Sequence, residues 1–337
     1  MEEFRVHGRR PGPNLLAWET NLMTIRRRDF LKASMMATLG AAAWPAWAER
    51  RNGMPYRPLG KTGEMVSLLC LGGSHIGGQR LSDAESIRIM RTAVDEGVNF
   101  FDNAWSYHGG RSEERMGAAL KDGYRDQVFL MTKHQGRDRE TAREHLETSL
   151  RRLDVDVIDL WQFHEYIHED DPERTYNEGA LEFALEARDE GKIRYIGVTG
   201  HFEPGIVSEM IDRGFEWDAV QFPMNVLDYH YRSFERAVLP KALEKDIGVI
   251  GMKTLGGPGQ IQKTGVATVE ECLHYVMSQP VATVCSGMDS MEVLRQNIAI
   301  TKQFRRLSDE AMTALRARCR GEAANGVHEP YKTVWHS

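Results

Sequence analysis

Short apolar runs alternate with amphipathic segments along most of the chain. The runs are four to seven residues long, as is typical of buried strands, and the segments between them carry apolar residues at helical spacing. Nearly continuous apolar strands that alternate with helices predict an α/β fold with a parallel sheet covered on both faces. Eight such units favour a closed (β/α)8 barrel, or TIM barrel, over a doubly wound sheet. The runs lie near residues 67–71, 98–101, 127–132, 157–163, 193–198, 219–222, 247–251 and 282–285.

Two of the segments between the runs begin with a helix-capping pattern, in which Ser or Thr is followed three residues later by Glu. These are Ser82-x-x-Glu85 and Thr141-x-x-Glu144. Each is followed by an apolar stripe that would face the barrel, and Gly97 is suited to end the first helix. The stripes consist of Ala84, Ile87, Met90 and Val94, and of Leu146, Leu150 and Leu153.

Two segments lie outside this alternation. Residues 57–63, with the sequence Arg-Pro-Leu-Gly-Lys-Thr-Gly, predict a tight β-hairpin that would plug the barrel floor. The tail from about Ala323 to Ser337 has no clear period, and its Tyr331 and Trp335 could fold over the barrel mouth. Because the chain shows no low-complexity linker, we expect residues 49–337 to form a single barrel domain.

The first 48 residues do not show the barrel pattern. Residues 24–32 resemble a twin-arginine (Tat) export signal, with Arg27-Arg28 as the pair. The apolar stretch that follows is about 15 residues long, shorter than the ~20 that span a bilayer. It ends in Ala46-Trp47-Ala48, a small-x-small cleavage pattern, so we predict that residues 1–48 are a signal peptide that is removed. An amphipathic helix and an uncleaved anchor are the alternatives, and translation could begin at Met1 or at Met23.

Removal of residues 1–48 would leave 289 residues, enough for one barrel of ~250 residues with loops. Because the removed part holds seven basic and four acidic side chains, the formal net charge would go from −6 to −9. An acidic chain argues against nucleic acid as a partner, and no later stretch is long and apolar enough to cross a bilayer. We therefore expect a periplasmic or otherwise exported protein that meets the Tat machinery and has no stable membrane insertion after cleavage.

The four cysteines are Cys70, Cys272, Cys285 and Cys319. Their spacing is not that of a metal site and contains no Cys-x-x-Cys, so no metal is expected. Cys70 and Cys285 lie in the first and last predicted strands, which become neighbours when a barrel closes. A disulfide between them is one reading in an oxidising compartment. We favour a pair of buried thiols, because Tat export carries folded proteins out of a reducing cytoplasm.

Polar residues stand at the ends of three successive predicted strands. Asp102 ends the second apolar run, and Tyr107 follows it by five residues. Lys133 ends the third run and His164 ends the fourth. In a (β/α)8 barrel, active sites are built at the carboxyl ends of the strands. An ammonium, a carboxylate and an imidazole placed around a phenol can make that phenol a usable acid.

These residues belong to two longer patterns. Residues 102–113 read Asp-x-Ala-x-x-Tyr-x-x-Gly-x-Ser-Glu, and residues 159–164 read Asp-Leu-Trp-Gln-x-His. Both patterns resemble the aldo-keto reductase superfamily, and the resemblance runs from about Arg57 to about Phe304. It implies an enzyme: an NAD(P)-dependent oxidoreductase that reduces an aldehyde or ketone to an alcohol, or catalyses the reverse oxidation.

The resemblance implies a role for each of the four strand-end residues. Tyr107 would donate the proton, while the nicotinamide supplies the hydride. A free phenol has a pKa of about 10, so Lys133 would lower the pKa of Tyr107, and Asp102 would keep Lys133 charged and oriented. His164, in its neutral form, would hydrogen-bond the substrate oxygen and fix its direction.

The resemblance also implies which residues contact the dinucleotide. Two glycines after the first strand would let the backbone approach the nicotinamide, and a glutamine would bind its carboxamide. A later loop would take the pyrophosphate, and a Gln-Asn pair would bind the adenine. The expected cofactor-binding positions are Gly72, Gly73, Asp102, Thr199, Gln221, Met252, Lys253, Gly256, Ser286, Gly287, Gln296 and Asn297.

Three positions depart from the family pattern. Residues 199–201, Thr-Gly-His, replace the usual Ser-Asn, and Met252 stands where the family stacks an aromatic ring on the nicotinamide. A thioether packs against a ring less rigidly. Asp289 lies in a loop that often carries Lys or Arg for the 2′-phosphate of NADP and would repel that phosphate, although Arg295 could compensate. The expected cofactor is therefore NADP, as family usage favours, or NAD, as Asp289 favours.

Two other functions fit parts of the sequence. A barrel that binds a dinucleotide tightly with little turnover could act as a sensor or accessory subunit. Residues 164–168 spell His-Glu-x-x-His, a zinc-protease motif, but that motif needs a helix, and His164 ends a predicted strand. We expect a monomer that acts on a small carbonyl or sugar-like molecule, with Trp105, Phe163 and Trp335 as candidate pocket residues.

Overall fold

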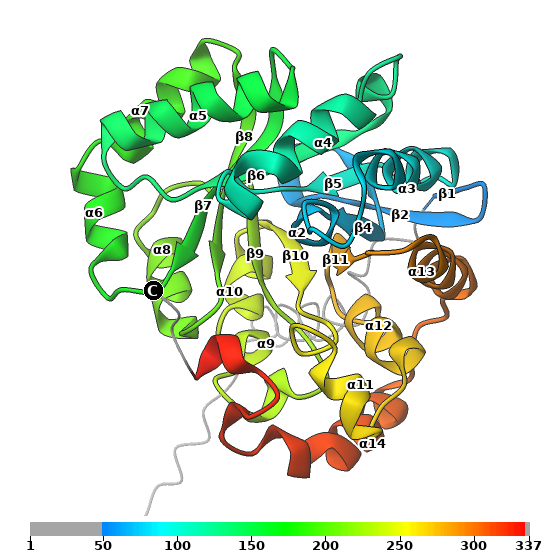
Figure 1. The fold of residues 1–337 in the computed structure, drawn as a ribbon. Helices are drawn as coiled ribbons and strands as arrows, with labels where there is room; N and C mark the ends of the chain where they lie inside the picture. Colours follow the sequence, from blue (N-terminus) through cyan, green and yellow to red (C-terminus); the bar gives the residue numbers. More distant parts are fainter. Residues whose placement is uncertain (1–48, 334–337) are drawn as a thin grey trace, which may run out of the picture. The chain divides into compact units, whose positions relative to one another are not determined.

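The computed structural model describes residues 49–333 as an eight-stranded parallel barrel surrounded by helices (Figure 1). The barrel strands are β4 (Leu69–Gly72), β5 (Phe100–Asp102), β6 (Phe129–His134), β7 (Ile158–Tyr166), β8 (Ile193–Gly200), β9 (Ala219–Pro223), β10 (Gly248–Met252) and β11 (Thr283–Gly287). They close in the order β10-β11-β4-β5-β6-β7-β8-β9. Each strand overlaps one of the eight apolar runs, so the predicted (β/α)8 architecture is confirmed. The expected signal peptide and Trp335 lie outside the described residues.

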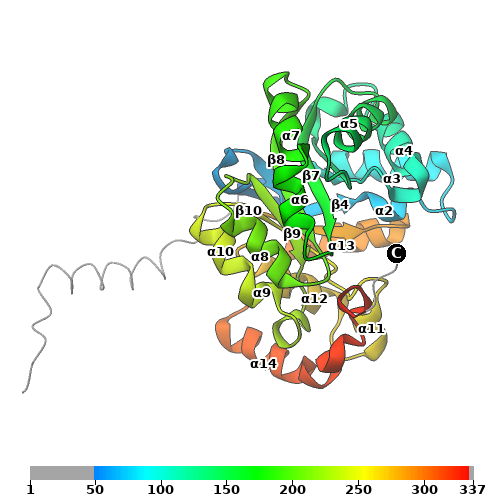
Figure 2. The same ribbon diagram turned by 90° about the vertical axis from the view of Figure 1, so that its left-hand side faces the viewer.

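Helices connect the strands and cover the outside of the barrel (Figures 1 and 2). They are α2 (Gly73–Ile76), α3 (Asp83–Asp95), α4 (Arg111–Ala119), α5 (Arg139–Leu153), α6 (Asp171–Asn177), α7 (Ala180–Asp189), α8 (Pro204–Asp212), α9 (Phe234–Ala237), α10 (Leu239–Glu244), α11 (Gln260–Thr264), α12 (Val269–Met277), α13 (Met291–Gln303) and α14 (Asp309–Cys319). Of the two predicted apolar stripes, Ala84 is exposed and the other members are buried or half-buried. Between residues 49 and 333, no helix is long and apolar enough to cross a membrane.

The capping patterns predict one helix start correctly and misplace another. Ser82 and Glu85 form a reciprocal capping box at the start of α3, and Gly97 follows the end of that helix with a φ of 95°. At α5 the N-cap is Asp138, whose carboxylate accepts the backbone N–H of Thr141 at 2.9 Å. Thr141 is therefore the third helical residue rather than the cap, because an aspartate three positions earlier caps equally well.

An antiparallel sheet closes the amino-terminal end of the barrel. Its strands are β1 (Arg50–Arg51), β2 (Met54–Pro58) and β3 (Met65–Ser67), and the predicted hairpin is the β2–β3 turn. Leu59 and Val66 are fully buried inside the barrel. At Gly60, φ is 49° and a Cβ atom would lie 2.3 Å from the backbone N of Gly248, so only glycine fits. The floor cluster consists of Leu59, Val66, Cys70, Phe100, Phe129, Met131, Leu160, Ala219, Ile250 and Ala282.

The C-terminal tail is held at the barrel mouth by buried ion pairs. Its 3-10 turns, η5 (Arg320–Gly326) and η6 (Pro330–Lys332), follow α14 and are red in Figures 1 and 2. The buried ammonium of Lys332 pairs with Asp228 at 2.6 Å and with Glu329 at 2.9 Å. Burial raises the pKa of Asp228 to about 6, and Lys332 opposes that rise. Asp228 lies in η4 (Asp228–His230), so its pair with Lys332 fastens the tail to the loop after β9.

The four cysteines carry free thiols. Cys70 on β4 and Cys285 on β11 are register partners, as expected for the first and last strands of a closed barrel. Burial raises the pKa of the Cys70 thiol well above its ordinary value. Cys70 therefore acts as a small apolar side chain of the floor cluster. The structure has two free thiols rather than a disulfide, and of the expected pair of buried thiols Cys70 is buried and Cys285 is half-buried.

Candidate active site

Three adjacent strands bring the predicted catalytic residues to the carboxyl end of the barrel. Asp102 is the last residue of β5, Lys133 is the last but one of β6, and His164 lies near the end of β7. Tyr107 begins η2 (Tyr107–Gly110), a short turn that follows β5. Because β5, β6 and β7 are neighbours in the barrel, the four residues share one site although they are far apart in the sequence.

Lys133 is at the centre of this site. Its buried ammonium forms an ion pair with Asp102 and donates a hydrogen bond to the carbonyl oxygen of Asn103 at 2.7 Å. Its Nζ lies 3.5 Å from Oη of Tyr107. The structure thus brings together the amine and the hydroxyl on which the predicted chemistry depends.

Both oxygens of Asp102 have partners. Oδ1 faces Lys133, while Oδ2 accepts a hydrogen bond from Nε2 of Gln221 at 2.6 Å and lies 3.2 Å from Sγ of Cys285. A carboxylate held on both oxygens has a fixed direction, and the ammonium that it binds is fixed with it. Gln221, which the resemblance assigns to the nicotinamide carboxamide, uses its amide nitrogen in this structure to hold Asp102.

Desolvation and charge act in opposite directions on the lysine and the tyrosine. Burial is the largest single effect on Lys133 and would lower its pKa, but Asp102, together with Tyr107 and Cys285, holds that pKa above its ordinary value. Desolvation raises the pKa of Tyr107, and the Lys133 ammonium opposes that rise without cancelling it. The Lys133 ammonium therefore acts on the Tyr107 pKa in the predicted direction, but desolvation is the larger effect and keeps that pKa above its ordinary value. The phenol is protonated at neutral pH, which is the form that a proton donor needs.

His164 is a neutral imidazole. Burial, followed by the charge of Lys133, lowers its pKa well below the ordinary value. Its ring stands edge-on to the ring of Tyr107, with 5.8 Å between the ring centres. Neither ring nitrogen has a hydrogen-bond partner among residues 49–333. His164 is therefore free to bind an oxygen that Tyr107 also reaches.

A cleft of about 620 Å³ opens beside Tyr107, a volume typical of small-molecule sites. Thr199 and Gly256 do not line it. The hydroxyl of Thr199 accepts the backbone N–H of Glu165 at 3.1 Å, and a Cβ on Gly256 would lie 2.6 Å from the carbonyl oxygen of His328 in the tail. The other ten expected cofactor positions line the cleft: Gly72, Gly73, Asp102, Gln221, Met252, Lys253, Ser286, Gly287, Gln296 and Asn297.

The cleft also contains residues that sequence reasoning missed. His75 packs directly on Gly287, where a Cβ atom would lie 2.0 Å from the His75 Nδ1. Arg80 and Asp289 both line the cleft, so its lining holds charges of both signs. Arg295, the expected compensating cation, is exposed and is not part of the lining. Arg80 belongs to no motif, and only its place in the folded chain reveals it.

The candidate pocket aromatics differ in their surroundings. Phe163 is fully buried and packs edge-on against Trp217 at 5.8 Å between ring centres, so it belongs to the core around the barrel. Trp105 is half-buried in the loop before Tyr107 and stacks on His145 at 3.7 Å. Neither Trp105 nor Phe163 lines the cleft beside Tyr107.

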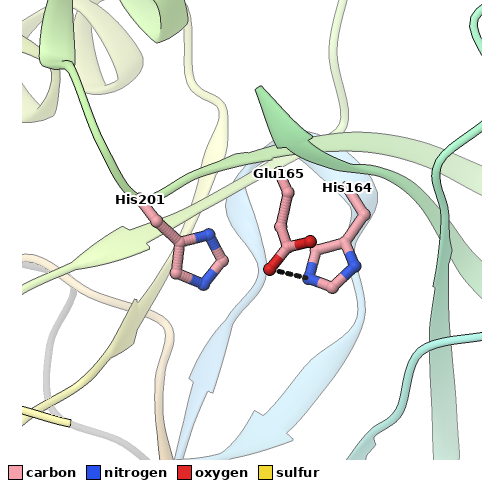
Figure 3. A group of neighbouring side chains, drawn as sticks. All are labelled: His164, Glu165 and His201. Carbon is pink, nitrogen blue, oxygen red and sulfur yellow. Dashed lines mark ion pairs between the residues drawn. The ribbon is translucent and has the colours of Figure 1, made fainter. Parts of the chain in front are cut away.

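A second histidine lies beside His164 at the barrel mouth. His201, directly after β8, has its ring centre 5.8 Å from that of His164. Figure 3 shows the carboxylate of Glu165 between the two rings. The linear His-Glu-x-x-His motif is not formed as a metalloprotease needs, because β7 continues as a strand through Tyr166 and His168 is exposed. This excludes the protease interpretation.

Residues 68–263, more than half of the chain, match the Aldo/keto reductase family. The chain belongs to this family. The matched segment begins just before β4 and ends within α11, so it contains Asp102, Tyr107, Lys133 and His164. Membership supports an oxidoreductase on a barrel scaffold, as the strand-end residues predict.

Individual proteins that are similar to this chain are also aldo-keto reductases. The aldo-keto reductase YhdN of Bacillus subtilis is 36% identical over 212 residues, which cover 58% of this chain and 60% of YhdN. The chain thus matches about three fifths of the length of such curated relatives. The holo form of aldo-keto reductase AKR11C1 from Bacillus halodurans has the same fold, with a TM-score of 0.67, 24% identity, and coverage of 79% of this chain and 96% of that one. The thermostable aldo-keto reductase Tm1743 is also similar, with a TM-score of 0.64 and 29% identity. The match covers 79% of this chain and 100% of Tm1743.

Proposed function

We propose that the protein reduces an aldehyde or ketone to an alcohol, or catalyses the reverse oxidation, with NADP or NAD as the hydride carrier and Tyr107 as the proton donor. The observation that supports this most strongly is the 3.5 Å distance between Nζ of Lys133 and Oη of Tyr107. The ammonium at this distance is held by Asp102. A fixed ammonium stabilises the phenolate that remains once the proton has been given up.

Each residue has a distinct task in the proton transfer. Tyr107 begins in its protonated form and passes its Oη proton to the substrate oxygen as that oxygen gains negative charge. Lys133 faces the resulting phenolate, and Asp102 keeps the lysine charged. His164 binds the same substrate oxygen through a neutral ring nitrogen and sets its direction. General acid catalysis of this kind accelerates a reaction by about 10²–10⁴-fold.

The cleft beside Tyr107 has features that suit a dinucleotide, which when bound would supply the hydride. Lys253 lines the cleft, and no carboxylate between residues 49 and 333 pairs with it. Desolvation lowers the pKa of Lys253, and the negative charge of a phosphate would counter that shift. Gly257 and Gly259 have φ values of 72° and 73° and place loop backbone along the cleft. Among the structural relatives, AKR11C1 was solved in a holo form.

The choice between NADP and NAD depends on two charges in the cleft lining. Asp289 would repel the 2′-phosphate of NADP, whereas Arg80 would attract it. Family usage favours NADP, and Asp289 favours NAD. Initial rates with NADPH and NADH, each measured at several concentrations with one carbonyl substrate, test this choice directly.

Comparison of Tyr107→Phe with Tyr124→Phe tests the proposed reduction. Oxidation of NADPH and NADH is followed by absorbance with a panel of aldehydes, ketones and sugars. We expect Tyr107→Phe to lower kcat about 10²–10⁴-fold, while binding of the dinucleotide, followed by fluorescence, is retained. Tyr124→Phe removes a phenol hydroxyl that reaches Asp95 at 3.3 Å on the surface, and this control should keep the parent rate.

Two results of that assay would contradict the proposal. Turnover that survives Tyr107→Phe would show that another group donates the proton. Tight dinucleotide binding without turnover of any carbonyl would favour the alternative function, a sensor or accessory subunit with this fold.

We also propose that the protein is exported as a folded monomer by the Tat machinery. The support is the signal-like segment within residues 1–48, whichever of Met1 and Met23 begins translation. Cell fractionation should find the parent in the periplasm and the variant Arg27→Lys/Arg28→Lys in the cytoplasm. Unchanged export of the twin-lysine variant would contradict this proposal.

A further inference from the structure

Three side chains with metal-ligating atoms meet at the barrel mouth, and one of them also belongs to the candidate active site. They are His164 and Glu165 near the end of β7 and His201 directly after β8. One ligand atom from each lies within 4.8 Å of the other two. Figure 3 shows the Glu165 carboxylate beside the His164 ring, with the His201 ring facing both from the opposite side. We call these three residues the mouth triad.

The backbone of β7 is distorted where it supplies two members of the triad. Successive side chains of a regular strand point to opposite faces of the sheet, so neighbours such as His164 and Glu165 would normally face apart. Here three steps along β7, from Phe163 to Tyr166, match two steps along β8, which is a β-bulge. Glu165 takes a φ of 54°, a conformation that a non-glycine residue adopts rarely. The bulge turns both side chains toward the mouth, and strain of this kind gathers at functional sites.

The imidazoles of the triad lack hydrogen-bond partners although both are buried. His164 is 1% exposed and His201 is 7% exposed. Both ring nitrogens of His164 and Nδ1 of His201 have no partner among the residues that the structure describes. Two buried imidazoles with ring nitrogens that make no hydrogen bond are therefore available as ligands.

We propose that His164, Glu165 and His201 form a binding site for a divalent transition-metal cation such as Zn²⁺. Two imidazoles and one carboxylate, with a further position left open, are a donor set that suits such ions. With bonds of about 2.0–2.1 Å, the ligand atoms of a tetrahedral site lie about 3.3 Å apart. The triad would close by about 1.5 Å at most from its present 4.8 Å, a change within reach of side-chain rotation.

Neighbouring groups position the carboxylate of the triad. Nε2 of Gln135 donates to Oε2 of Glu165 at 2.9 Å, and the backbone N–H of Glu165 donates to Thr199 Oγ1 at 3.1 Å. Groups that orient a ligand in this way contribute to metal affinity. Thr199 was expected to bind the cofactor. In this structure its hydroxyl instead holds the backbone of Glu165.

The cations around the triad are mostly paired with their own carboxylates. Lys133 pairs with Asp102, and Arg137 pairs with Asp171. These pairs reduce the repulsion that a bound metal ion would meet. Lys253 has no carboxylate partner between residues 49 and 333 and limits the affinity. The proposal stands on the geometry of the triad. Because His164 is also the residue that binds the substrate oxygen in the proposed reduction, a metal ion at the triad would compete with the substrate for it.

Co²⁺ is a suitable probe, because its visible absorption reports imidazole and carboxylate ligation directly. The purified protein, treated with a chelator and then dialysed, is titrated with Co²⁺ alone. We expect one bound Co²⁺ per chain with visible ligand-field bands, and loss of those bands when Zn²⁺ is added. Absence of the bands in the parent protein would overturn the proposal.

The variants separate the triad from the linear His-Glu-x-x-His motif. His201→Ala and Glu165→Gln should abolish the Co²⁺ bands, whereas His168→Ala, which removes the exposed last histidine of the motif, should keep them. Gln135→Ala should weaken Co²⁺ binding by about 10- to 100-fold. Bands that survive His201→Ala, or bands lost in His168→Ala, would contradict the assignment.

Circular dichroism and thermal unfolding without metal confirm that each variant is folded. If His201→Ala unfolds, His201→Asn, which keeps a polar side chain of similar length, replaces it in the same titration with the same expected loss of the bands. Zn²⁺ should raise the melting temperature of the parent and of His168→Ala, but not that of the triad variants, because a ligand stabilises only the state that binds it.

Discussion

The two ends of the barrel bury different kinds of side chain on the same eight strands. At the floor, the β2–β3 turn inserts Leu59 and Val66 into a cluster of apolar residues. At the mouth, Asp102, Lys133 and His164 are buried almost as completely. Apolar burial is favourable in any orientation, whereas a buried charge is tolerated only beside its partner. The apolar floor therefore stabilises the fold without specific pairing of side chains. At the mouth, each buried charge is stable only while its oppositely charged or hydrogen-bonding partner stays in place.

Breaking the central pair at the mouth should have the largest effect. Lys133→Met leaves the Asp102 carboxylate buried without its ammonium, which we expect to cost about 3–5 kcal/mol of unfolding free energy. Loss of the phenolate partner should also lower kcat by about 10²–10⁴-fold. Chemical denaturation and initial rates measure the two effects separately.

A second substitution sharpens this test. Lys133→Met combined with Asp102→Asn should recover much of the unfolding free energy, because no unpaired charge remains, but it should not recover activity. If the double variant is as unstable as the single one, pairing is not what holds the mouth together.

The floor should respond in the opposite way. Leu59→Ala removes a fully buried side chain and should lower the unfolding free energy by about 2–5 kcal/mol. Its kcat and KM, measured well below the melting temperature, should match those of the parent because the site at the mouth is intact. Leu243→Ala is the control, since Leu243 is 45% exposed, and its effect should stay within about 0.5 kcal/mol. A large fall in kcat for Leu59→Ala would show that the two ends are coupled.

The tail pair provides a test that depends on pH. Burial raises the pKa of Asp228 to about 6 from about 3.9 in the unfolded chain, so the folded state holds this proton more tightly. The contribution of Asp228 to stability is therefore fully present below pH ~4 and is lost as the pH rises through ~6. Two pKa units correspond to about 3 kcal/mol. Relative to Asp228→Asn, the parent should lose up to that amount in urea unfolding between pH ~4 and ~7, and a difference that does not change with pH would contradict the raised pKa.

The smallest effect is expected from the charges that line the cofactor cleft. Asp289→Asn removes a carboxylate that would face a 2′-phosphate and should raise the ratio of kcat/KM for NADPH to that for NADH by roughly fivefold, or about 1 kcal/mol. Arg80→Gln should shift the ratio in the opposite direction. If neither variant changes the ratio, the 2′ position of the cofactor lies elsewhere.

The fold and the strand-end residues could be predicted because their information is local. The run near 219–222 is β9 (Ala219–Pro223), and the run near 282–285 begins one residue before β11 (Thr283–Gly287). The residue that follows an apolar run stands at the carboxyl end of a strand, so Asp102, Lys133 and His164 could be placed at one site before the fold was known. The start of α5 was misplaced because two residues three positions apart, Asp138 and Thr141, offer comparable capping oxygens, and only the folded backbone selects Asp138.

Other features depend on groups that no sequence spacing relates. The raised pKa of Tyr107 results from desolvation by the whole mouth, which outweighs the one cation that the pattern identifies. Arg80 lines the cleft from a loop without a motif. His201 was seen as a departure from the family pattern, but nothing in its spacing showed that it would face His164.

By itself, the sequence determined the alternation of strands and helices, the glycine turn at the floor and the polar residues that stand at the strand ends. Each of these follows from apolar period and chain order over a few residues. Only the tertiary structure decided which carboxylate meets which ammonium, where the tail is fastened, and that Glu165 turns toward two histidines. Those outcomes depend on the pairing of β7 with β8 and on burial inside the complete barrel. Neither can be read from a short segment of the chain, because both need residues that are far apart in the sequence.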